Sequence, residues 1–289
     1  MALAALLLTA AAPPELGIVK WGRGYQAAAA RAKAEGKPLL VLFDEVPGCS
    51  TVLAFGDRVL SHPLLADAME HELVPVVVYN NIAGDDRKVL ERFQEPAWNN
   101  PVVRLFTPDG RQVARVDTGT PLEVAEAMAK ALAASGRAVP AYLQLVIDEE
   151  RGSGVRRQYA MGCFWEGEAA LGKLEGVTAT RTGFVKGREV VEVTYQGDVK
   201  QLDAYASARG YAPVSGALSA SVDDDKKQLQ AGRYRFVPMT SLQKTRVNAA
   251  PRDGARWLSP RQLQLYERGE RDVLQVDDVV EAYRLAGGR

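Results

Sequence analysis

The chain contains two cysteines, Cys49 and Cys163, and each stands where a short apolar segment gives way to a segment with helical spacing. At the start of a helix, free backbone N–H groups and the helix dipole favour a thiolate, the nucleophilic form of cysteine. Both positions therefore predict reactive thiols. The alternative for each is a buried, unreactive cysteine that packs as a small apolar side chain.

The other residue types do not indicate a metal site, a cofactor or a disulfide scaffold. Two distant cysteines and two histidines, His62 and His71, are too few for a thiolate zinc site or a disulfide framework. His62, next to Ser61 and Pro63, is best explained by helix capping. The acidic run 223–225 before two lysines predicts a helix start. We expect no metal and no cofactor.

Length and composition suit a globular protein of about two domains. The chain has 289 residues, 47% of them hydrophobic, and its 36 Lys and Arg balance 36 Asp and Glu. A basic field that would favour nucleic acid is absent, so no nucleic-acid partner is expected. No apolar run reaches the roughly 20 residues that cross a bilayer, so no membrane span is expected.

The first half of the chain has the pattern of an α/β domain. Continuous apolar runs, typical of buried parallel strands, occur at 39–43, 74–79 and 102–106. Residues 111–117 alternate as a hairpin partner. Helical spacing predicts helices at 21–36 and 121–135, and a further helical stretch at 140–149.

The Gly-rich segment Arg151-Gly-Ser-Gly154 is the best linker in the chain, and we place the domain boundary there. A new pattern follows it. Strands are expected at 157–161, 177–185, 188–195, 217–222 and 234–237, and helices at 164–174, 199–208, 241–249, 260–268 and 276–286. Three tryptophans, Trp21, Trp98 and Trp257, are expected in the core or at an interface.

Residues 18–135 resemble thioredoxin-like proteins, in which a cysteine follows a buried strand and a proline precedes the next central strand. Cys49 and Pro101 occupy these places. The resemblance implies that the Asn100–Pro101 bond is cis, that it faces the cysteine, and that Pro101 borders a peptide groove. Cis X–Pro bonds are about 5–6% of such bonds in folded proteins, so this expectation is specific.

One departure from thioredoxins concerns the second thiol. Val52 stands where thioredoxins carry a second cysteine, and Val46-Pro-Gly-Cys49 is similar to a thioredoxin-like group with a lone cysteine or selenocysteine. A single thiol cannot close a local disulfide. Dithiol reductase activity by this domain alone is therefore not expected.

The segment Met161-Gly-Cys-Phe-Trp165, with Glu168 and the stretch 174–183 after it, resembles the nucleophile motif of A-type peptide methionine sulfoxide reductases. The likeness runs over about 157–195. It implies that Cys163 attacks the sulfoxide sulfur and that Phe164 and Trp165 border the slot for the substrate methyl group. When the sequence is aligned with the family backward from Tyr195, Glu189 takes the place of the family's glutamate. The resemblance therefore implies that Glu189 donates a proton to the sulfoxide oxygen.

This second resemblance is incomplete. The family's long loop before the glutamate, which carries a substrate-binding tyrosine, is reduced to Lys186-Gly187-Arg188. A C-terminal resolving cysteine is also missing, so another thiol must resolve a sulfenic acid formed on Cys163. Within the chain the candidate is Cys49. The alternative is a domain that keeps the fold and has lost the activity.

The expected fold is α/β: a thioredoxin-like domain at 18–150, then an α+β plait of the methionine sulfoxide reductase A type with C-terminal helices at 155–289. The apolar start 1–14 is typical of a signal peptide without its basic end, which favours a periplasmic or secreted location; an apolar N-terminal helix or a misassigned start is the alternative.

The leading functional hypothesis is a thiol oxidoreductase that reduces methionine S-sulfoxide or a related S-oxide. Its partners would be an oxidised methionine or peptide and an external thiol or thioredoxin-type electron donor. Two alternatives remain: a thiol–disulfide relay centred on Cys49, and a peptide-binding module with a degenerate second domain.

Overall fold

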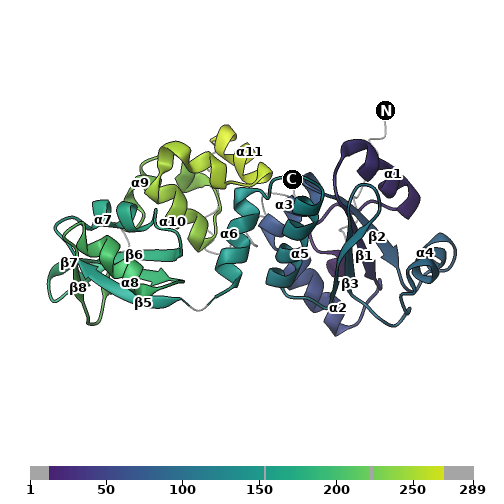
Figure 1. Cartoon of the computed structure of the whole chain (residues 1–289), viewed down its shortest axis with the longest axis horizontal. Helices are drawn as coiled ribbons and strands as arrows, with labels where there is room; N and C mark the ends of the chain where they lie inside the picture. Colours follow the sequence, from purple (N-terminus) through teal and green to yellow (C-terminus); the bar gives the residue numbers. More distant parts are fainter. Residues whose placement is uncertain (1–12, 153, 222–223, 270–289) are drawn as a thin grey trace, which may run out of the picture. The chain divides into compact units, whose positions relative to one another are not determined.

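The computed structural model describes residues 13–152, 154–221 and 224–269. The chain divides into two compact units, Met1–Arg137 and Ala138–Arg289, which are described separately (Figure 1). Most of the expected signal peptide and the expected helix 276–286 lie outside the described residues. None of the helices in the described part of the chain is both long and apolar enough to cross a bilayer.

The first unit is built on a four-stranded mixed sheet with the order β2-β1-β3-β4. Strand β2 runs parallel to β1, whereas β3 and β4 are antiparallel to their neighbours. This order and these directions are those of a thioredoxin-like sheet, so this part of the chain has the expected α/β fold. The strands are β1 (Leu39–Asp44), β2 (Val74–Tyr79), β3 (Val102–Phe106) and β4 (Gln112–Asp117).

Helices cover both faces of this sheet, which explains why β1 is buried along its whole length. Alternate residues of β1 and β2 pack with Tyr25, Val89 and Leu90 of α1 and α4 on one face. The helical elements are η1 (Pro14–Leu16), α1 (Tyr25–Glu35), α2 (Ser50–Phe55), one π-helical stretch η2 (Gly56–Leu60), α3 (Pro63–His71), α4 (Asp85–Phe93) and α5 (Pro121–Ala134).

Helix boundaries in the first unit follow from local capping. Helix α1 ends at Gly36, whose φ of 62° is left-handed and suits glycine. Helix α5 begins with a capping box in which Thr120 and Glu123 exchange hydrogen bonds. His62 caps α3, as expected: its Nδ1 accepts a hydrogen bond from the Leu65 N–H at 3.4 Å.

The second unit contains a five-stranded sheet with the order β8-β5-β7-β6-β9, and all neighbouring strands are antiparallel. After the first helix of this unit, the chain runs β-α-β-β-α-β through six elements, which gives the two split βαβ units of an α+β plait. These elements, with the edge strand that follows, are β5 (Val155–Ala160), α7 (Phe164–Leu171), β6 (Val177–Val185), β7 (Arg188–Tyr195), α8 (Val199–Ser207), β8 (Ala212–Val214) and β9 (Ser219–Ala220).

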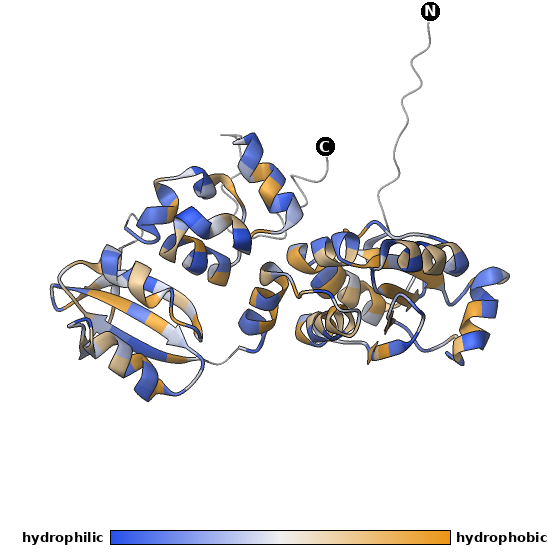
Figure 2. Ribbon diagram, turned by 45° about the horizontal axis from the view of Figure 1, so that its top comes forward, coloured by the Kyte–Doolittle hydropathy of each residue, from blue (hydrophilic) through white to orange (hydrophobic). Residues whose placement is uncertain are grey.

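Further helices pack as a separate small core around Leu229, Tyr234, Met239 and Val247. Figure 2 shows hydrophobic and hydrophilic residues alternating along these helices, as expected for elements with one buried face. They are α9 (Lys227–Gln230), η3 (Arg233–Phe236), α10 (Ser241–Ala249), η4 (Pro251–Trp257) and α11 (Pro260–Arg268). Helix α6 (Ala141–Glu150) packs against α10 and η4.

Two strand expectations need correction. Residues 234–237 are not a strand, because Tyr234 stacks on Tyr266 within the helical core, with ring centroids 4.5 Å apart, and belongs to the 3₁₀ helix η3. Strand β8 was not predicted. It has three residues and includes Pro213, which a strand tolerates at a sheet edge.

The boundary between the units lies between Arg137 and Ala138, not at the glycine-rich segment 151–154. Helix α6 therefore belongs to the second unit. Its Glu149 accepts from the Leu242 N–H of α10 at 3.3 Å, and the Asp148 carbonyl accepts from the Gln196 side chain at 3.0 Å. The glycine-rich segment therefore lies inside the second unit, because α6 is hydrogen-bonded to elements that follow this segment in the chain.

Candidate functional site

Cys49 is exposed and caps the N-terminus of α2. Hydrogen bonds from the backbone N–H groups of Val52 and Thr51 lower the pKa of its thiol. The loop before it is fixed from two sides. The Gly48 N–H donates to the Glu15 carboxylate at 2.9 Å, and the Asn81 amide donates to the Val46 carbonyl at 3.0 Å. A fixed loop therefore presents an exposed thiol with an enhanced thiolate character.

Asp44, at the end of β1, is a functional candidate that the sequence reasoning missed. Its side chain has no exposed surface, its Oδ1 accepts from the Glu45 N–H at 2.9 Å, and its Oδ2 lies buried without a hydrogen-bond partner among the described residues. Burial raises the pKa of Asp44 to about 7. The signal was an acid that directly continues an apolar buried strand.

The Asn100–Pro101 bond is cis, as predicted, and Pro101 is buried. The Val46–Pro47 bond is also cis, which was not predicted. Asn80 connects the proline turn to the end of β1: its backbone N–H donates to the Asp44 carbonyl at 2.7 Å, and its amide donates to the Asn99 carbonyl at 3.0 Å. The turn that carries Pro101 is therefore hydrogen-bonded, through Asn80, to the strand that leads to Cys49.

A buried carboxylate supports the same turn. Glu95 accepts from the Asn99 amide at 3.1 Å, from Arg104 Nε at 2.8 Å and from Arg115 at 2.5 Å. Although burial opposes ionisation, hydrogen bonds from Arg115 and Arg104 hold the pKa of Glu95 below its usual value. Because Glu95 and the two arginines satisfy one another's hydrogen bonds and charges, they hold the Asn99 side chain in one position.

In the second unit, Cys163 is half-buried and occupies the N-cap position of α7, without a capping hydrogen bond from its side chain. Glu189, on β7, lies beside it. The Glu189 Oε2 accepts from the Phe164 N–H at 2.7 Å, and the Glu189 carbonyl accepts from the Met161 N–H at 3.1 Å. The carboxylate thus lies at the helix end that carries the thiol, where the helix dipole favours a negative charge. Its role as a proton donor stays a prediction.

Three aromatic side chains surround this helix end. The Phe164 ring is buried, with its centroid 5.8 Å from that of Trp165 and 5.5 Å from that of Phe184. Phe184 was not singled out from the sequence; it pairs with Glu189 across the β6–β7 hairpin. Two cavities of the second unit, of about 420 and 330 Å³, have none of these rings in their walls. Trp165 and Phe184 are both exposed and form an aromatic surface beside Phe164, and the slot for a substrate methyl group stays a prediction.

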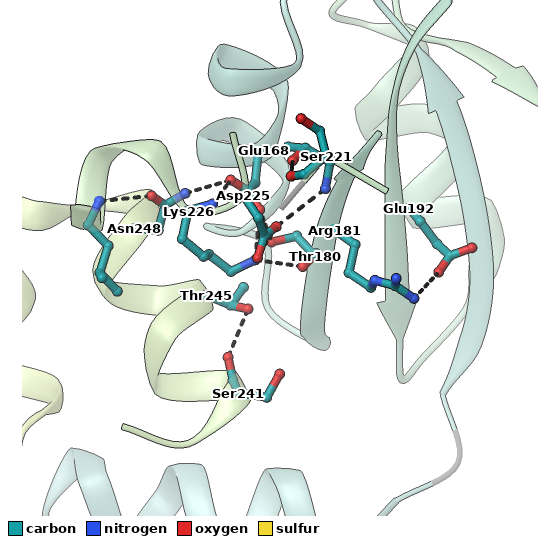
Figure 3. Close-up of polar contacts among 12 residues, drawn as sticks. Glu168, Thr180, Arg181, Glu192, Ser221, Asp225, Lys226, Ser241, Thr245 and Asn248 are labelled. Carbon is teal, nitrogen blue, oxygen red and sulfur yellow. Dashed lines mark hydrogen bonds and ion pairs between the residues drawn. The ribbon is translucent and has the colours of Figure 1, made fainter. Parts of the chain in front are cut away.

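The other end of α7 is fixed by Glu168, which is 1% exposed (Figure 3). Its carboxylate accepts from the Lys226 ammonium at 2.7 Å, the Lys226 N–H at 3.0 Å, the Thr180 hydroxyl at 3.0 Å and the Asn248 amide at 3.0 Å. Burial raises the pKa of Glu168, and Lys226 opposes the rise. We call Glu168, Thr180, Lys226 and Asn248 the Glu168 cluster; it joins the plait to the C-terminal helices.

Exposed large hydrophobic side chains gather near the two thiols. Leu53 lies one turn after Cys49 in α2, Ile82 follows Asn81, and Trp98 precedes the proline turn. Trp98 is 81% exposed, so of its two expected places the core is excluded and the interface stays a prediction. With Trp165 and Phe184, these account for five of the six such side chains in the described part of the chain. Within the described ranges, no group of His, Cys, Asp and Glu side chains has the arrangement of a metal site.

Comparisons with known proteins give a likeness in part of the chain. No family model and no curated protein matches it. A solved structure titled "DsbH Oxidoreductase" is 18% identical, with a TM-score of 0.35, over 44% of this chain and 92% of its own. A thioredoxin from Thermus thermophilus is 20% identical, with a TM-score of 0.36, over 41% of this chain and 90% of its own. The thioredoxin-like fold of the first unit rests on its own strand order.

Proposed function

We propose that the protein is a thiol oxidoreductase in which Cys49 exchanges disulfides with a polypeptide partner. One observation carries the proposal: Cys49 is exposed, and backbone N–H groups at the start of α2 lower the pKa of its thiol. A thiolate at neutral pH is the species that attacks a disulfide. A cysteine kept only for packing would be buried in an apolar environment.

The exchange needs a proton carrier as well as a nucleophile. The Cys49 thiolate attacks one sulfur of the partner disulfide, a mixed disulfide forms, and the other sulfur leaves as a thiolate that takes up a proton. Asp44 is suited to hold that proton, because its pKa of about 7 lies near ambient pH. The chain has no second cysteine near Cys49 in the sequence, so a thiol of an external donor resolves the mixed disulfide.

The chemistry of the surroundings favours a polypeptide over a small disulfide. Leu53, Ile82 and Trp98 are exposed on the segments that flank the thiol and the proline turn. Exposed apolar groups gathered in one region commonly mark a protein–protein contact. Trp is also enriched among the residues that dominate binding energy at such contacts.

A trapping experiment tests this function. The full chain with Cys163→Ser keeps Cys49 as its single thiol, and Cys49→Ser keeps Cys163. We expect Cys163→Ser to form a mixed disulfide with a disulfide-linked peptide near pH 7, read by intact mass, and to release it on addition of dithiothreitol. Cys49→Ser is the matched control. Equal or faster reaction of Cys49→Ser contradicts a role for Cys49 as the exchanging thiol.

A second function, reduction of methionine S-sulfoxide at Cys163, is favoured by the position of Glu189. Its carboxylate accepts from the Phe164 N–H, one residue from the thiol, within an aromatic surface suited to a methyl group. Cys163 would attack the sulfoxide sulfur while Glu189 protonates the oxygen. Methionine leaves, Cys163 becomes a sulfenic acid, and a second thiol converts it to a disulfide with loss of water.

The proposed second thiol is Cys49, or otherwise an external thiol or thioredoxin-type donor. One equivalent of a peptide containing methionine S-sulfoxide is added to the full chain, free thiols are counted, and any bridge is mapped by mass spectrometry. A Cys49–Cys163 linked peptide supports the internal relay. Sulfenate trapped on Cys163 with Cys49 still free assigns resolution to an external thiol. No oxidation of Cys163 refutes the sulfoxide reductase function and leaves the Cys49 proposal untouched.

A further inference from the structure

The second unit contains a cavity of about 420 Å³ whose wall includes neither Cys163 nor the aromatic residues beside it. Its wall is formed by residues of β6 and β9 on one side and of α9, η3 and α10 on the other. Its wall includes four basic side chains, Arg181, Lys226, Arg235 and Lys244, and one acidic side chain, Asp225. The proposed chemistry of Cys49 and Cys163 uses none of these residues.

The acidic residue in the wall is already compensated. Asp225 Oδ1 accepts from the Lys226 ammonium at 3.1 Å and from the Thr182 N–H at 3.3 Å. Lys226 also binds Glu168 at 2.7 Å, so its charge is shared between two carboxylates (Figure 3). One ammonium therefore faces two carboxylates, so Lys226 brings no unpaired positive charge to the cavity wall.

The other three cations are not neutralised in this way. Lys244 is half-buried and has no hydrogen-bond or ion-pair partner among the described residues, and Arg235 has only the Phe236 ring, 4.5 Å from its guanidinium carbon. Arg181 lies 3.8 Å from Glu192, a long ion pair whose arginine is exposed and which contributes little. The cavity therefore concentrates positive charge in a chain whose acidic and basic residues balance overall.

We infer that this cavity binds a small organic anion that carries phosphate or carboxylate groups. A volume of about 420 Å³ is in the range of small-molecule sites. Arg235 and Arg181 offer planar guanidinium groups that match the paired oxygens of either anion, and Lys244 adds a compact charge. The Thr182 and Ser221 side chains in the same wall supply polar groups for orientation.

Calorimetric titration of the full chain tests the inference with three probes: inorganic phosphate, pyrophosphate and citrate. We expect at least one of them to bind at millimolar concentration or below, and to bind more weakly as NaCl is raised. Preference for the phosphates identifies a phosphorylated ligand, and preference for citrate identifies a carboxylate. Both outcomes support the anion site, and no binding of any probe overturns it.

Two variants locate the binding. Lys244→Gln and Arg235→Gln should each weaken the bound probe about tenfold, since each removes one charge-assisted contact. Lys200→Gln changes the same charge at an exposed position of α8, outside the cavity, and should leave the affinity unchanged. Because Arg235 is exposed, its substitution leaves the core intact even if Lys244→Gln fails to fold. Equal weakening by Lys200→Gln overturns the assignment to this cavity.

Discussion

Replacing Asp44 by Asn should make the protein more stable, and the gain should grow with pH. The ordinary pKa of the carboxyl is 3.8 and burial raises it to about 7. Between these values the folded state holds a proton that the unfolded state has lost, so stability falls as pH rises. Above both values, the ionised side chain costs the fold about 4 kcal/mol. Asn keeps the shape and an oxygen for the Glu45 N–H, and it carries no charge.

The measurement is urea unfolding of the full chain at a series of pH values from 5 to 9. Over this range, the stability gap between Asp44→Asn and the wild type should widen by about 3 kcal/mol, or about 10 °C in Tm for a unit of this size. Asp85→Asn is the control, because Asp85 is exposed and its pKa is lowered by Lys88. A gap for Asp44→Asn that stays constant with pH refutes the reasoning, since Asp44 would then be ionised throughout.

Three further predictions address other described groups. Glu189→Gln keeps an acceptor for the Phe164 N–H but removes the acid, so sulfoxide turnover should fall about 100-fold with little change in Tm; unchanged turnover excludes Glu189 as the proton donor. Glu168→Gln removes the carboxylate that pairs with the buried Lys226 ammonium, so the free energy of unfolding measured in urea should fall by about 3 kcal/mol. Glu166→Gln, at an exposed position of the same helix, should change it little. Burial lowers the pKa of half-buried His62 to about 4, so the stability of the wild type relative to His62→Asn, which can still cap α3, should fall by about 2 to 3 kcal/mol as pH falls from 6.5 to 4.

Much of the first unit could be predicted from sequence because its strands are buried on both faces. Residues 39–43 and 74–79 are continuous apolar runs, and the structure has β1 and β2 there. The cis bond before Pro101 was predicted from the resemblance to thioredoxin-like proteins, in which a proline precedes the next central strand. Asp44 was not recognised as a functional candidate. Its raised pKa comes from burial beneath the helices that cover the sheet, and the sequence of one strand does not show this burial.

In the second unit, the hairpin of β6 and β7 was predicted with its turn at Lys186-Gly187, where both residues have positive φ. Glu189 was nominated by register, and the structure places it at the N-terminus of α7. Phe184 and the anion cavity were missed for one reason. Both depend on which residues the fold brings next to β6, and α9 is too short to leave a periodic pattern in the sequence.

The Glu168 cluster has a consequence for how the protein is made. Asn248, which closes the cluster, lies 80 positions after Glu168 in the chain. At the usual rate of synthesis, the ribosome needs roughly 4 to 16 s to add that many residues. During this interval, α7 can form but its buried acid lacks Asn248. The nascent plait is therefore incomplete until the C-terminal helices emerge, and in that interval it offers its apolar surface to chaperones.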